Sequence, residues 1–193
     1  MTDQMSFGGF APPVPTDRLF FAIFPDEAAR AAIATFAQGL AKQHKLRGKP
    51  LLPERFHITL HHLGDYAELP PDLVVGAKQA AKQMIAAPFD VAFDHVASFA
   101  TRVEKKPCVL LGEEGDTPLR RLRKLLGECL IEANQGKHVA RDFTPHVTLL
   151  YDRTLVPPHV VAPISWTVRE FALVHSLLGK TEHRVLQRWA LQD

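Results

Sequence analysis

The stretch RFHITLHHLGD (55–65) recurs in altered form as DFTPHVTLLYD (142–152). In each copy a phenylalanine leads an apolar run, and a histidine is followed two residues later by a threonine. The two pairs are His57 with Thr59 and His146 with Thr148. The apolar and β-branched neighbours favour a strand, in which residues i and i+2 point to the same face. Each copy therefore predicts a strand that places an imidazole beside a hydroxyl.

Helices and strands are expected to alternate early in the chain, and strands are expected to pair with each other late in the chain. Strands are expected over 18–24, 55–63, 89–99, 107–112, 145–151, 166–177 and 183–191. Helices are expected over 26–44, 70–87 and 117–134. Gly64 is expected to end the first motif strand, and Gly179 to join the last two strands as a hairpin. This order predicts an α+β fold whose sheets are substantially antiparallel.

The spacing of the motifs predicts the domain organisation. The two motif histidines are 89 residues apart, so each half of the chain carries one. We therefore expect two pseudo-symmetric lobes, mostly antiparallel sheet with outer helices, and an active-site cleft between them. Residues 1–17 are rich in Gly and Pro and are expected to form a flexible leader, leaving 18–193 as a single bilobal domain. Disorder is favoured there over stacking of Phe7 or Phe10 on a base.

Composition sets bounds on the function. Hydrophobic residues make up 46% of the chain and charged residues 23%, as in ordinary globular proteins. The net charge of +2 is compatible with a phosphate-bearing ligand but too small to suggest a long nucleic-acid track. No signal peptide and no span of membrane length is visible, so a cytoplasmic protein is expected. Cys108 and Cys129 lie in apolar contexts and are expected to be free thiols.

The paired motifs predict chemistry on a phosphate ester. One histidine can take a proton from an attacking water while the other gives a proton to the departing oxygen. Threonine hydroxyls two residues away can donate hydrogen bonds to the non-bridging phosphate oxygens, where charge is concentrated. This arrangement requires no cofactor and no metal.

A metal site is the alternative interpretation of the first motif. On a helix, His57 and His61 would be four residues apart and could share a zinc ion with His62 as a neighbour. The run Ile58–Leu60 favours a strand instead, and no glutamate occupies the position that a helical zinc motif needs. We therefore expect no metal site.

Further segments carry a family resemblance. The opening RLFFAIFPDE (18–27), both motif segments and the closing LVHSLLGKTEHRVLQRWAL (173–191) resemble the 2H phosphoesterase superfamily. Within it, the chain resembles the bacterial and archaeal RNA 2′,3′-cyclic phosphodiesterases, also called 2′-5′ RNA ligases. The paired motifs are specific to the superfamily and much less specific to one substrate.

The resemblance implies an activity and roles for the motif residues. It implies a bilobal fold that opens RNA 2′,3′-cyclic phosphate to 2′-phosphate without a metal or cofactor, and in some relatives joins ends by the reverse reaction. Carried over, His57 and His146 are the catalytic pair, and Thr59 and Thr148 bind the substrate phosphate. We expect His57 to be the acid and His146 the base, although the sequence itself does not decide this. The expected partner is an RNA end or a small nucleotide, and the expected state is a monomer.

The chain departs from the family pattern beside both motifs. Relatives often carry a phosphate-binding arginine where this chain has Tyr151, and the nearest arginine is Arg153. By strand parity, His61 shares a face with His57 and is a candidate cleft residue, whereas His62 falls on the opposite face. Tyr151 and Arg153 are likewise candidate cleft residues.

Three alternatives stay open. The substrate could be another nucleotide, such as a 2′-5′ oligonucleotide, a cyclic nucleotide or ADP-ribose cyclic phosphate. The protein could also be an RNA-end receptor without turnover, although a pure binder has no need of two acid–base groups. A basic cluster on the third helix is expected to be a solvated face rather than a phosphate contact; its members are Arg120, Arg121, Arg123 and Lys124.

Overall fold

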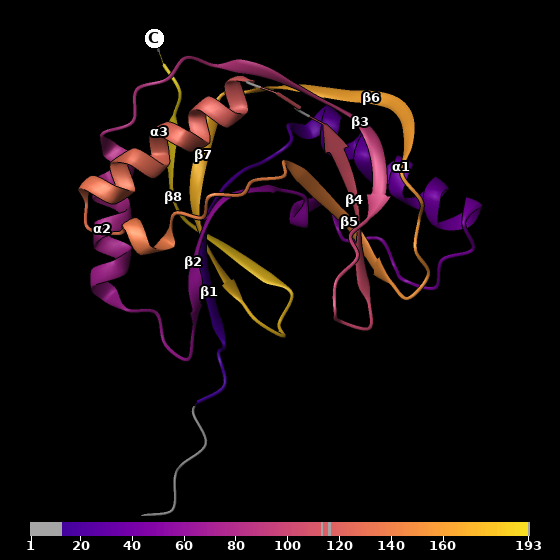
Figure 1. Ribbon diagram of the computed structural model, residues 1–193, viewed down its shortest axis with the longest axis horizontal. Helices are drawn as coiled ribbons and strands as arrows, with labels where there is room; N and C mark the ends of the chain where they lie inside the picture. The colour runs from indigo at the N-terminus through magenta and orange to yellow at the C-terminus, as the bar shows by residue number, and fades with distance from the viewer. Residues whose placement is uncertain (1–12, 113, 116, 193) are drawn as a thin grey trace, which may run out of the picture.

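The computed structural model describes residues 13–112, 114–115 and 117–192, and these form two four-stranded antiparallel sheets (Figure 1). The first sheet is built around β1, where Leu19, Phe21 and Ile23 are fully buried on one face. In spatial order its strands are β2 (Ile58–Tyr66), β1 (Asp17–Ile23), β7 (Glu170–Leu177) and β8 (Glu182–Ala190). The second sheet contains β5 (His146–Asp152), β4 (Lys106–Gly112), β3 (Phe89–Ser98) and β6 (His159–Val168).

Each motif strand lies at an edge of its own sheet. β2 begins directly after His57 and carries Thr59 beside β1, and β5 carries both His146 and Thr148 beside β4. The predicted α+β class with two lobes of antiparallel sheet is confirmed.

The helices complete the two lobes from different parts of the chain. α2 (Pro71–Lys82) and α3 (Pro118–Glu132) pack on each other and on the first sheet. α1 (Glu27–Gln43) follows β1 in sequence but packs against β5 and β6 of the second sheet (Figure 1). The first lobe therefore comprises β1, β2, β7, β8, α2 and α3, and the second comprises α1 and β3 to β6. Because the chain crosses between lobes early, one continuous apolar core underlies both.

Several element boundaries differ from the sequence prediction. The strand expected over 55–63 begins only at Ile58, after a short 3-10 helix at Pro53–Arg55. α2 ends at Lys82, before the expected Ala87, because the backbone of Ala86 pairs with Gln192, whose N–H donates to the Ala86 carbonyl at 2.9 Å. The single strand expected over 166–177 is wrong, because Arg169 separates β6 from β7. β6 was missed because it is a largely exposed edge strand interrupted by Pro163, so it lacks a strong apolar alternation.

The expectation that Gly64 ends the first motif strand is also wrong. β2 continues to Tyr66, and Gly64 adopts a φ of 126°, which favours glycine. The Tyr66 hydroxyl donates back to the Leu63 carbonyl at 2.6 Å, and its ring occupies the space where a Gly64 side chain would lie.

The ends of the domain are only partly described. Asp17 already belongs to β1, and the N–H of Thr16 donates to the Tyr66 carbonyl at 2.8 Å, so the sheet begins before residue 18. The expected leader, with Phe7 and Phe10, lies largely outside the described residues. Cys108 and Cys129 are free, as predicted. No helix in the described ranges combines the length and apolar character needed to cross a membrane.

Candidate active site

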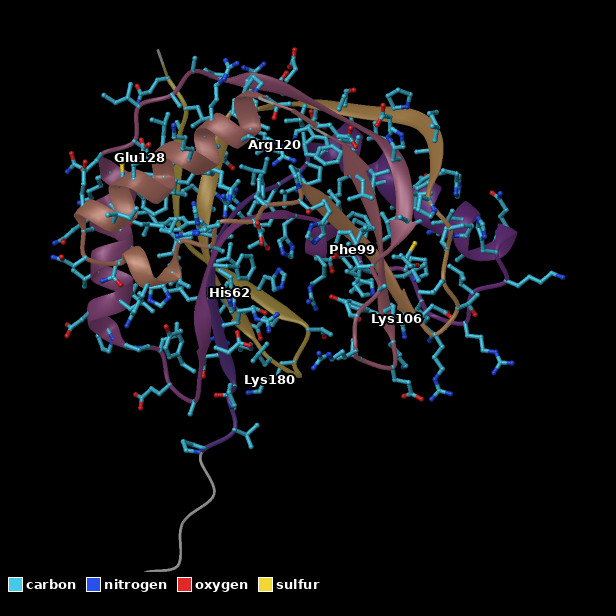
Figure 2. All side chains as sticks on the ribbon, viewed as in Figure 1. His62, Phe99, Lys106, Arg120, Glu128 and Lys180 are labelled. Atoms are coloured by element: carbon cyan, nitrogen blue, oxygen red, sulfur yellow. The ribbon has the colours of Figure 1, made fainter. Side chains whose placement is uncertain are left out.

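The two His–Thr motifs meet in one cavity between the lobes. The cavity has a volume of about 470 Å³, which is typical of small-molecule sites. Its lining includes both motif pairs: His57, Thr59, His146 and Thr148. In Figure 2 the first lobe is marked by His62 on β2, and the second by Phe99, whose ring contacts His146.

Each motif histidine is oriented by the backbone two residues before it. Nδ1 of His57 lies 2.7 Å from the Arg55 carbonyl oxygen, and Nδ1 of His146 lies 2.7 Å from that of Thr144. A carbonyl oxygen can only accept a hydrogen bond, so Nδ1 carries the proton in both rings. Nε2 is then the nitrogen that can accept or release a proton toward a ligand.

Each motif histidine also packs against a phenylalanine of its own lobe. The Phe20 ring lies 5.0 Å from the His57 ring, and the Phe99 ring lies 5.0 Å from the His146 ring. The backbone contact and the aromatic contact together restrict each imidazole to one orientation. The two lobes therefore present matched units, as the repeated motif predicted.

The motif hydroxyls remain available for a ligand. Thr59 and Thr148 are both half-buried at the cavity wall. Neither hydroxyl forms a hydrogen bond with another residue in the described part of the chain. Each is thus a neutral donor that can point at a phosphate oxygen.

A bulge in β2 determines which of the two histidines after the first motif lines the cavity. Phe21 pairs with His61 but Ala22 pairs with Thr59, so Leu60 is an extra residue. A bulge of this kind reverses the facing of the residues beyond it. Leu60 and His61 are both buried, and His62 lines the cavity instead. The parity-based assignment of His62 to the opposite face is therefore wrong. His61 does not line the histidine cavity, but it borders an adjoining cavity that also includes Thr59 and His146.

His61 and Arg123 together hold this bulge against α3. The His61 ring nitrogen Nε2 lies 2.8 Å from the Arg123 carbonyl oxygen. The Arg123 guanidinium donates to the Leu60 carbonyl and to carbonyls of the segment before β5, and it lies over the Phe143 ring at 4.7 Å. Arg123 therefore joins the two motifs structurally, which corrects the expectation that it belongs to a solvated face.

The two candidate cleft residues after the second motif, Tyr151 and Arg153, lie in different places. Tyr151 lines the histidine cavity, and 47% of its surface is exposed. Arg153 does not line this cavity. It forms an ion pair with Glu104 at 2.5 Å and borders a neighbouring cavity that shares Tyr151. The expectation that Arg153 is a cleft residue is therefore not met at the histidine cavity.

Two arginines that the sequence reasoning missed line the cavity. Arg18 forms two hydrogen bonds with the Asp65 carboxylate, both at 2.7 Å, so its charge is already paired. Arg55 has no ion-pair partner among the described residues. Arg55 ends the short 3-10 helix Pro53–Arg55, which precedes β2, so strand parity does not place it, and its nearness to His57 was the only signal in the sequence.

A third histidine approaches the first motif from β8. The His183 ring lies edge-on to the His57 ring at a centroid distance of 5.1 Å, and it also lines the cavity. Its Nδ1 is buried without a hydrogen-bond partner among the described residues. No motif marks His183 in the sequence, because only its pairing with Ser176 in the closing hairpin brings it to the cavity.

Burial lowers the pKa of these imidazoles and so favours their neutral form. Loss of water contact is the largest cause, and it lowers the pKa of His57 to about 4. The hydrogen bond to the Arg55 carbonyl opposes this shift, whereas the positive charges of Arg55 and His146 add to it. Burial also lowers the pKa of His146, and it lowers the pKa of His183 to about 4.

A metal site at the first motif does not fit this arrangement. His57 and His61 do not lie on a helix, and the His61 ring is bound to α3 rather than directed to the cavity. Across the described ranges, no three His, Cys, Asp or Glu side chains are grouped so that they could hold a metal ion.

Comparison with known proteins matches the chain to one family. The model of the 2'-5' RNA ligase superfamily matches residues 24–180, which include both motifs. The chain belongs to this superfamily. No curated protein matches the chain.

Several solved structures share the fold. Escherichia coli LigT superposes with a TM-score of 0.70 at 24% identity, over 93% of this chain and 100% of LigT. A Thermus thermophilus protein gives a TM-score of 0.69 at 28% identity, over 90% of this chain and 97% of that protein. LigT complexed with 3′-AMP gives a TM-score of 0.65 at 25% identity, over 93% of this chain and 100% of LigT.

Proposed function

We propose that the protein hydrolyses RNA 2′,3′-cyclic phosphate ends to 2′-phosphates, with His57 and His146 as acid and base. The observation that carries the proposal is the matched pair of His–Thr units that line one cavity from two lobes. Membership of the 2'-5' RNA ligase superfamily supports phosphoester chemistry. The binding of 3′-AMP and ATP by LigT supports a nucleotide substrate.

The proposed step uses Nε2 of both rings. His146 takes a proton from water, and the water oxygen forms a bond to phosphorus. The bond between phosphorus and the 3′ oxygen breaks, and protonated His57 gives its proton to that oxygen. The products are a 2′-phosphate and a 3′-hydroxyl, with the proton now on His146. With a 5′-hydroxyl in place of water as the nucleophile, the same ring-opening step would join RNA ends through a 2′-5′ linkage, and its reverse would cleave that linkage.

The phosphate is held by neutral donors and one cation. The Thr59 and Thr148 hydroxyls donate to the non-bridging oxygens. Arg55 lines the cavity without an acidic partner in the described ranges, so it supplies the positive charge that relatives place where this chain has Tyr151. Because Arg55 also holds His57 through its carbonyl, it couples phosphate binding to the orientation of that ring.

The deciding experiment is turnover of RNA ending in a 2′,3′-cyclic phosphate, in chelator, with end-group analysis of the product. The panel also contains a 2′-5′ oligonucleotide, a nucleoside 2′,3′-cyclic monophosphate and ADP-ribose cyclic phosphate. We expect RNA ends to be preferred and the product to carry a 2′-phosphate. A 3′-phosphate product, or tight binding of RNA ends without turnover, would contradict the proposal.

The pH dependence follows from the lowered pKa values. The acid must hold its proton before reaction, so kcat/KM falls as pH rises through the higher of the two histidine pKa values. Burial lowers the pKa of both histidines from 6.5, which moves this loss to lower pH. We expect the kcat/KM optimum below pH 6.5. A bound phosphate anion favours the imidazolium, so the kcat profile should lie at higher pH. A kcat/KM optimum at pH 7 or above would contradict this.

A further inference from the structure

Two further cavities adjoin the histidine cavity in a row along the second lobe. The first, of about 430 Å³, shares Tyr151 with it and is bordered by Arg47, Lys105 and Arg153. The second, of about 530 Å³, shares Arg47 with the first and is lined also by lysines of α1 and of the loop after it. We call this region the basic face; its cations are Lys42, Lys45, Arg47, Lys49, Lys105 and Arg153.

The positive charge of the basic face is largely unpaired. All six cations are exposed. Arg153 pairs with Glu104, whereas the other five have no ion-pair partner within the described ranges. The whole chain carries a net charge of only +2. Five unpaired cations beside the histidine cavity are therefore a local concentration of positive charge. The net charge of the whole chain does not reveal this concentration.

The loop that carries Arg47 and Lys49 is fixed to the second motif strand. The buried Asp152 carboxylate accepts hydrogen bonds from the N–H groups of Arg47 at 2.6 Å and Gly48 at 2.5 Å. Farther along the loop, the Leu51 N–H donates to the Leu149 carbonyl at 2.7 Å. Any side chain at residue 48 would overlap the Tyr151 carbonyl oxygen. The cations are thus presented by an anchored loop at a set position relative to His146 and Thr148.

Tyr151 lies where the histidine cavity meets the basic face. Its side chain is half exposed, and the residue borders both the histidine cavity and the adjoining cavity of about 430 Å³. Proteins that bind single-stranded nucleic acids use an exposed aromatic ring beside a row of cations. A base stacks on the ring, and the phosphates contact the cations. An acidic peptide would use the cations but would leave the ring without a matching partner.

We propose that the basic face binds the single-stranded RNA that lies 5′ of the terminal phosphate, with Tyr151 stacking on a base and Arg47 and Lys49 on the backbone phosphates. This inference rests on the proposed function for the direction of the strand. It makes the substrate an RNA oligonucleotide rather than a mononucleotide.

The test compares substrates of two lengths, a nucleoside 2′,3′-cyclic monophosphate and an octanucleotide with the same end. For wild type, we expect kcat/KM to be larger for the octanucleotide. In the double variant Arg47→Gln/Lys49→Gln, the ratio of the two values should fall at least about tenfold. The slope of log(kcat/KM) against log[salt] for the octanucleotide should become shallower by about 1.4, or roughly 0.7 for each phosphate that the variant no longer neutralises. The matched control Lys82→Gln/Lys124→Gln removes two charges from helices of the first lobe and should keep the wild-type ratio.

Fluorescence anisotropy of a labelled RNA octanucleotide tests the same face without turnover. We expect the double variant to bind at least about tenfold more weakly than wild type and the control variant. Equal binding by both variants, or equal competition by octaglutamate and RNA, would overturn the inference. If wild type turned over neither substrate, the proposed function would fall, while the anisotropy measurement would still decide whether the basic face binds RNA.

Discussion

Alanine in place of His57 is expected to lower kcat for a 2′,3′-cyclic phosphate by about 10²–10⁴-fold, the usual contribution of one proton transfer. In the proposed mechanism, this variant lacks the group that protonates the departing 3′ oxygen. His146→Ala should lose a similar factor, because no base then activates the water. Thermal midpoints near that of wild type would show that the losses are chemical. The matched control is His95→Ala, which removes an exposed histidine on β3 that is hydrogen-bonded to Asp94.

A sulfur in place of the departing 3′ oxygen assigns the two roles. A thiol has a pKa of about 8.5, so a thiolate departs without a proton donor. If His57 is the acid, His57→Ala should regain most of the wild-type rate on the 3′-thio substrate. His146→Ala should stay slow on both substrates, because it still lacks the base. Recovery by His146→Ala instead would reverse the assignment. Recovery by neither variant would mean that neither ring acts as the acid.

Local pattern was sufficient for the motif strands and for the fold class. The apolar neighbours of His57 and His146 required strands, and the 89-residue spacing placed one motif in each lobe. What the pattern could not predict was the crossing of α1 to the other sheet. One face of α1 is apolar and buried, and it includes Ile33, Ala37 and Leu40. This pattern does not show against which sheet the helix packs, because either sheet offers an apolar surface.

The errors in the site have one physical cause, which is that strand pairing is a tertiary property. Parity counting placed His61 in the cavity, but the pairing of β2 with β1 inserts Leu60 as a bulge and brings His62 there. His183 reaches the cavity through its register with Ser176, which no spacing in the sequence specifies. Arg55 lies in the 3-10 helix Pro53–Arg55 before β2, so counting strand parity could not place it either.

Replacing either motif threonine with valine is the second change with a large expected effect. Valine keeps the β-branched shape that suits a strand but removes the hydroxyl donor. Thr59→Val and Thr148→Val should each lower kcat by about 10²–10³-fold, as expected when one donor to a developing oxyanion is removed. KM should change less, because these hydrogen bonds strengthen in the transition state. Serine at either position should retain most activity, and Thr167→Val, on the edge strand β6, is the matched control.

The double variant Thr59→Val/Thr148→Val tests whether the matched units act as a pair. If each hydroxyl holds a different phosphate oxygen, the two losses should multiply. If the hydroxyls act only as one unit, the double variant should be no slower than either single variant. The structure gives both threonines the same place beside an oriented histidine, and neither hydroxyl has another partner in the described ranges. We therefore expect multiplication. A silent Thr148→Val would mean that the second lobe contributes its histidine alone, so the internal symmetry of the fold would not extend to the chemistry.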